Sequence, residues 1–489
     1  MDRQTVWQET FGFFAYQPIV VEPVDAHLST DAGLLPIRQL DEALGLTGQF
    51  AAALRDRRVG PALIHSFLEM TRMRVYGILA GYEDQNDHDA LRHDAVFKLI
   101  AGRSPEDRDL ASQPTLSRFE NSITPRSLFN LQDVFLDQFI ASFDEPPTHL
   151  TFDVDCFDDA VHGQQQLTFF HGYYDQYQYL PRVITCAEND QVVMVALLFG
   201  TAAPSLGLID DLKYLVARLR AVWPDVHISL RADSGFAVPT VYEECEQFDI
   251  RYTIGLKMNA VLQLQSKTLL AEVVARFEET GQPQRRFTAF WYQAGSWPQP
   301  RFVVVKAEAN AQGTNRRAVV TDRPGAQVLP EAAYDEYTER GESENRNKEL
   351  KCSLGADRLS DHRFLANYFR LYLHCLSANL LVRVRDVVAD PPLPQPSTEL
   401  PTEALAGRDR KRYFNQRRQA DPLGEGHAET WRMRLIKVAA EIVVSVRRVW
   451  VRLSGSWPFL DHYRTVSAAV NAACARLSQG DSAFSLDSG

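Results

Sequence analysis

Hydrophobic and polar residues follow two different periods along the chain, and the period changes near residue 147. Within residues 35–57 and 62–79, apolar positions recur at the three- and four-residue spacing of amphipathic helices. The turn-forming sequence Asp-Glu-Pro-Pro at residues 144–147 then interrupts this pattern. We therefore predict a helical N-terminal region over residues 1–147.

From residue 148 onward the pattern becomes that of an α/β domain. Its segments follow the order strand, hairpin, helix, strand, helix, strand, at residues 150–157, 183–198, 206–222, 226–232, 238–248 and 251–256. This order is typical of the ribonuclease H-like fold, although many α/β domains share parts of it. We predict the first part of a ribonuclease H-like core over residues 148–256.

Shorter signals divide the rest of the chain. Residues 257–330 contain strand-like segments separated by Gly and Pro, which favours a β-rich insertion. Helical spacing predicts that residues 331–387 complete the core. The remaining segments are a Pro-rich linker at 388–407, a basic C-terminal region at 408–477 and a disordered tail at 478–489 that is rich in Ser, Gly and Asp.

Composition is that of a globular protein with several domains. The chain has 489 residues, of which 45% are hydrophobic and 24% charged. The six cysteines form no CxxC pair, which argues against a zinc site or a disulfide framework. We expect a cytoplasmic protein without a signal peptide or a membrane span, because its longest apolar run, near residues 192–199, is too short to cross a bilayer.

Charge is distributed unevenly along the chain. The net charge is −11, yet residues 408–452 contain twelve Arg or Lys against five Asp or Glu, a balance of +7 that leaves −18 for the rest. A basic segment on an acidic body is compatible with an enzyme that acts on DNA. A solvated charged surface explains the same pattern, and charge alone favours that simpler interpretation.

Carboxylates stand out at two strand ends and on one helix. Asp153 and Asp155 lie two residues apart on a predicted strand and so project from the same face, and Asp233 ends another strand. Glu344 lies on a predicted helix. Converging carboxylates are the oxygen ligands that Mg2+ prefers, and two such ions serve phosphoryl transfer. Each acid alone is more often a turn or cap residue.

The helix around Glu344 carries a second signal. Tyr337, Arg340, Glu344 and Lys351 fall within an arc of about 60 degrees when the helix turns by about 100 degrees per residue. One face then offers an acid for a metal ion, two cations for phosphates and a hydroxyl for a phosphate oxygen. An exposed helix with ordinary charge pairs has the same spacing, and spacing alone favours that interpretation.

The spacing Tyr-x2-Arg-x3-Glu-x6-Lys resembles the signature of bacterial insertion-sequence transposases of the four-like group. The wider chain resembles the thirteen-eighty branch of these DDE transposases, from about residue 20 to residue 465. The matching stretches are residues 110–121, 152–159, 162–165, 172–174, 179–181, 230–236 and 364–371. So many ordered matches favour a functional role for the Glu344 helix over the simpler interpretation.

The resemblance implies a ribonuclease H-like catalytic core with a β-rich insertion and a helical N-terminal region that binds the transposon ends. It implies Asp155, Asp233 and Glu344 as catalytic acids that bind Mg2+, for which Mn2+ can substitute. Asp153 is the alternative first acid; we prefer Asp155 because it lies nearer the strand end. Asp158 and Asp159 are further candidates, which the sequence assigns more readily to the following turn.

DNA contacts follow from the same resemblance. Tyr337, Arg340 and Lys351 are expected to contact phosphates of the transposon end. An aromatic residue of the insertion is expected to stack on a flipped base, with Trp291 and Trp297 as candidates, although a Trp in a small β domain is more often a core residue. Three groups have both a DNA-binding and a structural interpretation: Arg316 and Arg317 in the insertion, Asn315 beside them, and Gln113, Ser117, Arg118 and Asn121 in the N-terminal region.

The activity implied is that of a DNA transposase, which cleaves the ends of its element and joins the 3'-hydroxyl to target DNA. Its partner is double-stranded DNA, in the form of terminal inverted repeats and target, and a homodimer is expected because each of the paired ends needs an active site. Two other functions stay open: a domesticated DNA-binding regulator that does not use the triad, and a ribonuclease H-like nuclease without strand transfer.

Overall fold

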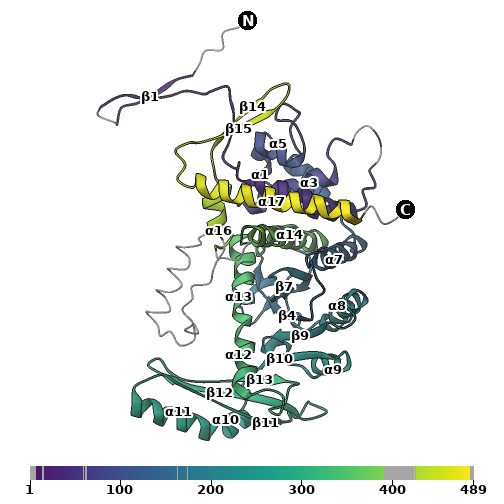
Figure 1. Cartoon of the computed structure of the whole chain (residues 1–489), viewed down its shortest axis with the longest axis vertical. Helices are drawn as coiled ribbons and strands as arrows, with labels where there is room; N and C mark the ends of the chain where they lie inside the picture. Colours follow the sequence, from purple (N-terminus) through teal and green to yellow (C-terminus); the bar gives the residue numbers. More distant parts are fainter. Residues whose placement is uncertain are drawn as a thin grey trace.

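The structure is a computed structural model that describes residues 7–389 except 14, 15, 59, 61, 62, 162 and 173, together with residue 423 and residues 426–484. Most of the predicted linker and the first part of the basic region therefore lie outside the described residues. Figure 1 shows helices from both ends of the chain at the top, a large sheet in the middle and a smaller layer of strands and helices at the bottom. None of the described helices is long and apolar enough to cross a membrane.

Short helices make up most of the described N-terminal region, and side-chain caps set several of their starts. Ser66 accepts a hydrogen bond from the backbone N–H of Glu69, and Thr124 and Ser127 form a reciprocal capping box. The elements are β1 (Glu9–Phe11), β2 (Ile19–Val21), β3 (His27–Ser29), α1 (Leu34–Leu44), α2 (Leu46–Ala53), α3 (Phe67–Ala80), α4 (His88–Leu91), α5 (Ala95–Ala101), α6 (Gln113–Asn121) and α7 (Pro125–Ile140).

The C-terminal region shares one core with the N-terminal region and is not a separate unit. Strand β14 (Ala440–Val444) pairs with β3 and with β15 (Val449–Leu453), and α17 (Leu460–Phe484) packs on α1. Val466 and Val470 of α17 belong to the same buried cluster as the N-terminal helices. Helix α17 also runs to residue 484, so residues 478–484 are helical where disorder was expected; residues 485–489 lie outside the described part of the chain.

The strands predicted for the core lie next to one another in the central sheet. Strands β8, β7, β4, β9 and β10 lie side by side, with β4, β9 and β10 parallel and β7 antiparallel to both of its neighbours. The result is a mixed α/β architecture with a large mixed sheet, consistent with a ribonuclease H-like fold. The elements are β4 (His149–Cys156), β5 (Asp159–Ala160), β6 (Phe169–His171), β7 (Gln176–Cys186), β8 (Val192–Phe199), α8 (Leu208–Val222), β9 (His227–Ala232), α9 (Pro239–Gln247) and β10 (Ile250–Leu256).

The predicted insertion is partly helical and extends the central sheet. Its strands β11 (Gln284–Tyr292), β12 (Arg301–Asn310) and β13 (Gly313–Thr321) join β10 through β13, which gives a ten-stranded sheet. The helices α10 (Ala260–Gln265) and α11 (Lys267–Thr280) precede them, where a β-rich segment was expected. Helix α11 forms because its apolar face, centred on Val273, packs against Ala307 and Ala309 of β12.

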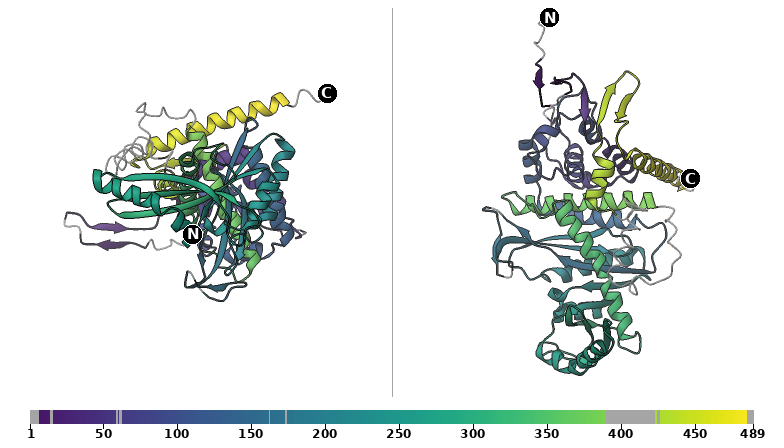
Figure 2. Two further views of the ribbon diagram at one scale, coloured as in Figure 1. Left: turned by 90° about the horizontal axis from the view of Figure 1, so that it is seen from below. Right: turned by 90° about the vertical axis from the view of Figure 1, so that its left-hand side faces the viewer.

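The predicted helix over residues 331–352 is a series of shorter helical pieces. Helix α12 (Pro330–Thr338) is followed by α13 (Arg340–Lys348) and by a π-helical turn, Glu349–Ser353. Figure 2 shows this column passing along the central sheet from the lower layer up to α14 (Phe364–Ala389). The remaining helical pieces are α16 (Ala428–Trp431) and a π-helical turn, Arg432–Ile436.

Candidate active site

Asp155 and Asp233 lie at the same edge of the sheet. Strands β4 and β9 are parallel with Val154 opposite Ala232, so the residue that follows on each strand reaches the edge beside the other. Asp155 Oδ2 accepts hydrogen bonds from Arg340 Nη1 at 3.1 Å and from Asn347 Nδ2 at 3.2 Å. Burial raises the pKa of Asp155; Arg340 opposes this rise, and the charge of Asp233 adds to it. The two strand acids therefore repel each other, and Arg340 offsets part of that repulsion.

A tight turn fixes Asp233. Its side chain accepts the backbone N–H of Gly235 at 2.8 Å and caps a short 3-10 turn at residues 234–236. The neighbouring strand must also lack a side chain, since a Cβ at Gly255 would lie 2.7 Å from the Tyr337 hydroxyl and 3.1 Å from the backbone nitrogen of Ser234. Glycine at position 255 thus lets the Tyr337 hydroxyl approach the Asp233 turn.

The face of α13 brings Arg340 and Glu344 to this edge. Arg340 forms ion pairs with both Asp155 and Glu344, and it is nearly buried, whereas 55% of the Glu344 side chain is exposed. Burial raises the pKa of Tyr337, and the adjacent Arg340 opposes that rise. The structure therefore brings five sequence-predicted residues together: Asp155, Asp233, Tyr337, Arg340 and Glu344.

Lys351 lies apart from these five residues. Its Nζ donates to Asp158 Oδ1 at 2.5 Å, which lowers the pKa of Asp158 although burial opposes that change. The expected helix face requires one regular helix, but the chain passes into a π-helical turn at Glu349. The wider turn changes the direction in which Lys351 points. Asp158 thus has a Lys351 partner that sequence reasoning did not anticipate.

Asp153 has a different environment from Asp155. Both of its carboxylate oxygens accept hydrogen bonds at 2.8 Å from Arg231, which lies directly opposite it on β9, and only 2% of Asp153 is exposed. Burial disfavours the charged form of Arg231, but its hydrogen bonds to Asp153 outweigh burial and raise the pKa of Arg231 above the usual value. Sequence reasoning missed Arg231, although an arginine in an otherwise apolar strand is a signal for a buried ion pair.

The remaining predicted DNA contacts divide between surface and core. Trp291 on β11 is 61% exposed, whereas Trp297 is 6% exposed and packs edge-on against Tyr242 and Tyr292. Trp297 is therefore a core residue and not a candidate for base stacking, contrary to the expectation from the sequence. Arg316 donates to the backbone oxygen of Gln263 at 2.7 Å, so it ties the end of α10 to the sheet.

Among the N-terminal candidates, Asn121 holds the end of α6 by donating to Asp361 at 2.9 Å and to the Ser117 backbone at 3.0 Å. The backbone N–H of Gln113 donates to Asp89 at 2.9 Å, at the start of the same helix. These contacts give both residues a structural role. Asn347, which sequence reasoning missed, lies one turn beyond Glu344 and reaches Asp155.

The side chains at the sheet edge offer the type of ligand atom that a hard divalent cation prefers. Asp155, Asp233 and Glu344 offer only carboxylate oxygens, and the first two repel each other, a condition that a bound cation relieves. Within the described residues, no group of three His, Cys, Asp or Glu side chains is already arranged to enclose a metal ion. In this arrangement the Arg340 guanidinium supplies the positive charge between Asp155 and Glu344.

Comparison with known proteins identifies the family. No curated protein matches the chain. One solved structure that is similar is a piggyBac transposase synaptic complex with hairpin DNA, with 13% sequence identity over 82% of this chain and 81% of that chain and a TM-score of 0.39, too low for residue roles to be carried over. Residues 11–395 match the family described as Transposase DDE domain group 1. Because this match covers most of the chain, the protein belongs to the DDE transposase domain family.

Proposed function

We propose that the protein is an active transposase, which binds the inverted repeats of an insertion sequence, cleaves their ends and joins the 3'-hydroxyl to target DNA. Asp155, Asp233 and Glu344 are the ligands for Mg2+, or Mn2+ in its place. The observation that carries the proposal is the meeting of two strand-end acids with the Arg340–Glu344 pair at one edge of the sheet. Membership of the DDE family supports the same chemistry.

Asp155 is the first catalytic acid in this proposal, and Asp153 is not. Asp153 is enclosed and shares both oxygens with Arg231, so metal binding would break a buried ion pair. Asp155 shares a single arginine with Glu344, and its side chain is 17% exposed. A carboxylate that is incompletely paired and open to solvent suits a metal ligand better than one that is enclosed.

The residues around the acids hold and orient DNA. Divalent cations held by Asp155, Asp233 and Glu344 would supply activation of the attacking oxygen and stabilisation of the leaving oxygen of the phosphodiester. Arg340 offsets part of the charge of the acids before DNA arrives, and its guanidinium has the planar geometry that binds phosphate oxygens in pairs. The Tyr337 hydroxyl, beside the Asp233 turn, donates to a phosphate oxygen, and Lys351 adds a cation at the Asp158 side. No covalent protein intermediate is involved.

Two features of the proposed complex lie beyond the acids. The exposed ring of Trp291 is the candidate for stacking on a flipped base, worth about 1–3 kcal/mol per base. Two copies of the chain act on paired ends, because each end needs its own set of acids. The DNA partner is double-stranded in both the donor and the target.

The test is cleavage of DNA that carries the inverted repeats flanking the reading frame. We expect Glu344→Gln to abolish Mg2+-dependent nicking, since the metal ligand is removed, and to leave DNA affinity close to that of the unaltered protein, since Arg340 keeps its ion pair with Asp155. Glu342→Gln is the matched control, an exposed glutamate two residues away on the same helix that contacts none of the three acids. Full nicking activity of Glu344→Gln would overturn the assignment. Supplying a pre-cleaved 3'-hydroxyl end and a target plasmid then separates a transposase from a nuclease.

A further inference from the structure

A basic pocket of about 410 Å³ lies outside the cluster of acids, in the N-terminal region. The end of α2, the start of α3, helix α6 and the start of α7 surround it. Its charged lining residues are Arg55, Arg57, Arg58, Arg118, Arg126 and Asp56, which is five positive charges against one negative charge, a balance of +4. This local charge has the opposite sign to the net charge of the chain, −11.

Within the described residues, most of this positive charge has no acidic partner. Only Arg58 forms an ion pair, with Asp56 at 2.7 Å, and it also lies 4.6 Å above the Phe67 ring. Arg118 donates to the Thr115 hydroxyl at 3.0 Å, which leaves its charge uncompensated. Arg126 lies over an aromatic ring, and Arg55 and Arg57 make no ion pair in this part of the chain. Like charges that line one pocket repel one another, and a bound anion relieves that repulsion.

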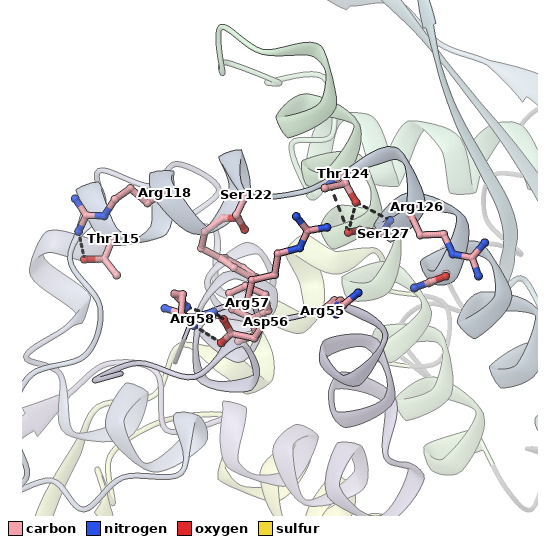
Figure 3. A pocket seen from close by; sticks show the side chains of 13 residues that line it. Arg55, Asp56, Arg57, Arg58, Thr115, Arg118, Ser122, Thr124, Arg126 and Ser127 are labelled. Carbon is pink, nitrogen blue, oxygen red and sulfur yellow. Dashed lines mark hydrogen bonds and ion pairs between the residues drawn. The ribbon is translucent and has the colours of Figure 1, made fainter. Parts of the chain in front are cut away.

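The lining chemistry suits phosphate groups in a row. Guanidinium groups bind phosphate oxygens in pairs, and nearby hydroxyls donate further hydrogen bonds. Thr115 and Ser127 line the pocket with such hydroxyls. Figure 3 shows Arg118 and Arg126 at opposite sides of the pocket with the segment 55–58 between them, so the cations are spread out and do not form one cage. That spread favours an extended polyanion over a single small anion.

The pocket lies toward the edge of the sheet that carries the acids. Just after α7, Ser142 accepts a hydrogen bond from Asn189, which precedes β8, and Gln132 within α7 accepts one from the backbone N–H of Val195 in β8. Helix α7 therefore runs antiparallel to β8 and also to β4, because both of these strands are antiparallel to β7. The start of α7, where Arg126 lies, is therefore at the end of the sheet where β4 delivers Asp155.

A series of hydrogen bonds runs from the end of α6 toward the same edge of the sheet. At the end of α6, Asn121 bonds to Asp361 at 2.9 Å, and the backbone of His362 bonds to Gln166 at 2.9 Å. Residue 166 belongs to the loop segment that begins beyond Asp158, the partner of Lys351. These bonds link α6, which lines part of the pocket, to the loop between β5 and β6.

We propose that this arginine pocket, defined as Arg55, Arg57, Arg58, Arg118 and Arg126, binds consecutive phosphates of the duplex DNA whose scissile bond lies at the acids. The inference rests on the proposed function for the identity of its ligand, and it adds a second DNA-binding surface that is separate from the acids. The pocket reads no bases, since guanidinium–phosphate contacts fix position and not sequence. Its contribution is to affinity and to the direction in which the duplex leaves the active site.

The experiment measures the affinity of the full chain for a fluorescent duplex at several NaCl concentrations. Removing one protein–phosphate ion pair lowers the slope of log affinity against log salt by about 0.9. We expect Arg55→Ala/Arg57→Ala and Arg118→Ala/Arg126→Ala each to remove about two such pairs, to lower the slope by about 1.8 and to weaken binding about tenfold or more at physiological salt. Arg55→Lys/Arg57→Lys keeps the charge and should keep most of the slope, which separates loss of charge from a folding defect.

The matched control is Arg285→Ala/Arg286→Ala, two exposed arginines of β11 that are already paired with Asp335 and Glu272. The affinity of this control variant for the duplex, and the slope of its log affinity against log salt, should equal those of the unaltered protein. Unchanged affinity and slope in both pocket variants would overturn the proposal, as would tight binding of tripolyphosphate in the pocket with no effect of the variants on duplex binding. The same titrations are repeated with the pocket substitutions made in Glu344→Gln protein, which is expected not to nick DNA. The measured affinity then does not depend on whether the protein cleaves DNA.

Discussion

Strand β4 and the helical column that begins with α13 each carry two carboxylates of contrasting kinds, one in the interior and one at the sheet edge. The interior pair is Asp153 and Glu349, both at most 6% exposed. Asp153 shares both oxygens with Arg231, and Glu349 accepts from Arg385, from Arg346 and from the backbone N–H of a residue of α16. Burial opposes the charge of Glu349, but Arg385 lowers its pKa below the usual value.

The pair at the sheet edge is Asp155 and Glu344, only two and five residues away in sequence from the interior pair. These two share a single arginine, Arg340, and they face the further charge of Asp233. The interior acids are thus saturated with donors, while the edge acids share one cation among three. Saturated acids stabilise the fold; the edge acids keep oxygens free for a ligand that brings positive charge. Substitutions at the two kinds of site should separate stability from activity.

The largest effect is expected at the edge of the sheet. Asp155→Asn should reduce Mg2+-dependent DNA nicking by a factor on the order of 10³ or more, because a metal ligand is removed and each 1.4 kcal/mol of missing stabilisation lowers the rate about tenfold. The free energy of unfolding should change by less than about 1 kcal/mol, since Asn keeps the size of the side chain and removes the repulsion from Asp233. Nicking assays and urea unfolding on the same preparation check both parts. Activity within tenfold of the unaltered protein would contradict the edge assignment.

The next effect is expected in the interior. Asp153→Asn leaves the buried Arg231 charge with only the exposed Glu339 as an ion-pair partner, so the free energy of unfolding should fall by about 3 kcal/mol, the lower end of the cost of breaking a buried pair. Urea unfolding measures this loss, and the folded fraction should still nick DNA. The double variant Asp153→Asn/Arg231→Leu removes both charges and should recover much of the stability. If the Asp153→Asn protein had the same free energy of unfolding as the unaltered protein but nicked no DNA, Asp153 and not Asp155 would be the first catalytic acid.

The strands themselves were predictable because they follow from local patterns, which also placed Asp155 and Asp233 at strand ends. The pairing of β4 with β9 in parallel, which brings the two acids to a common edge, is a tertiary feature that the sequence analysis did not predict. The helices of the insertion were missed, because α11 owes its burial to β12, which lies later in the chain. The shared core of the two chain ends was missed for the same reason: the partners of β3 and α1 come more than 400 residues later.

The candidate site was only partly predictable. Helical spacing placed Arg340 and Glu344 on one face, and both reach the edge. The same geometry misplaced Lys351, since a π-helical turn depends on packing and has no simple sequence signal. Trp297 and Trp291 differ in burial because of the tertiary neighbours of one ring and not because of their own sequence context. The choice between Asp153 and Asp155 depends on Arg231, whose role requires the register of two strands.

The smallest of the expected effects concerns an interior group that has no charged partner. His374 on α14 is 1% exposed, and its Nδ1–H donates to the backbone oxygen of Leu354 at 2.8 Å. Burial and the nearby charge of Arg74 lower the pKa of His374 to about 3. The contrast between the two kinds of acid predicts that such a group stays neutral in the folded protein, because the interior accommodates a charge only where it is paired.

The pH dependence of stability tests this point. The unfolded chain takes up a proton at His374 near pH 6.5 and the folded protein does so only near pH 3, so stability is full above pH 6.5 and falls as the pH is lowered. Between pH 7 and pH 5 the loss from this residue is about 2 kcal/mol. Urea midpoints of the unaltered protein and of His374→Gln, whose amide can still donate to Leu354, should diverge over that interval, with the variant losing less. His88 is also buried and its pKa is also lowered, but it is present in both proteins and cancels in the difference. An equal loss in the two proteins would mean that His374 carries its proton in the folded state, and that the interior tolerates an unpaired charge.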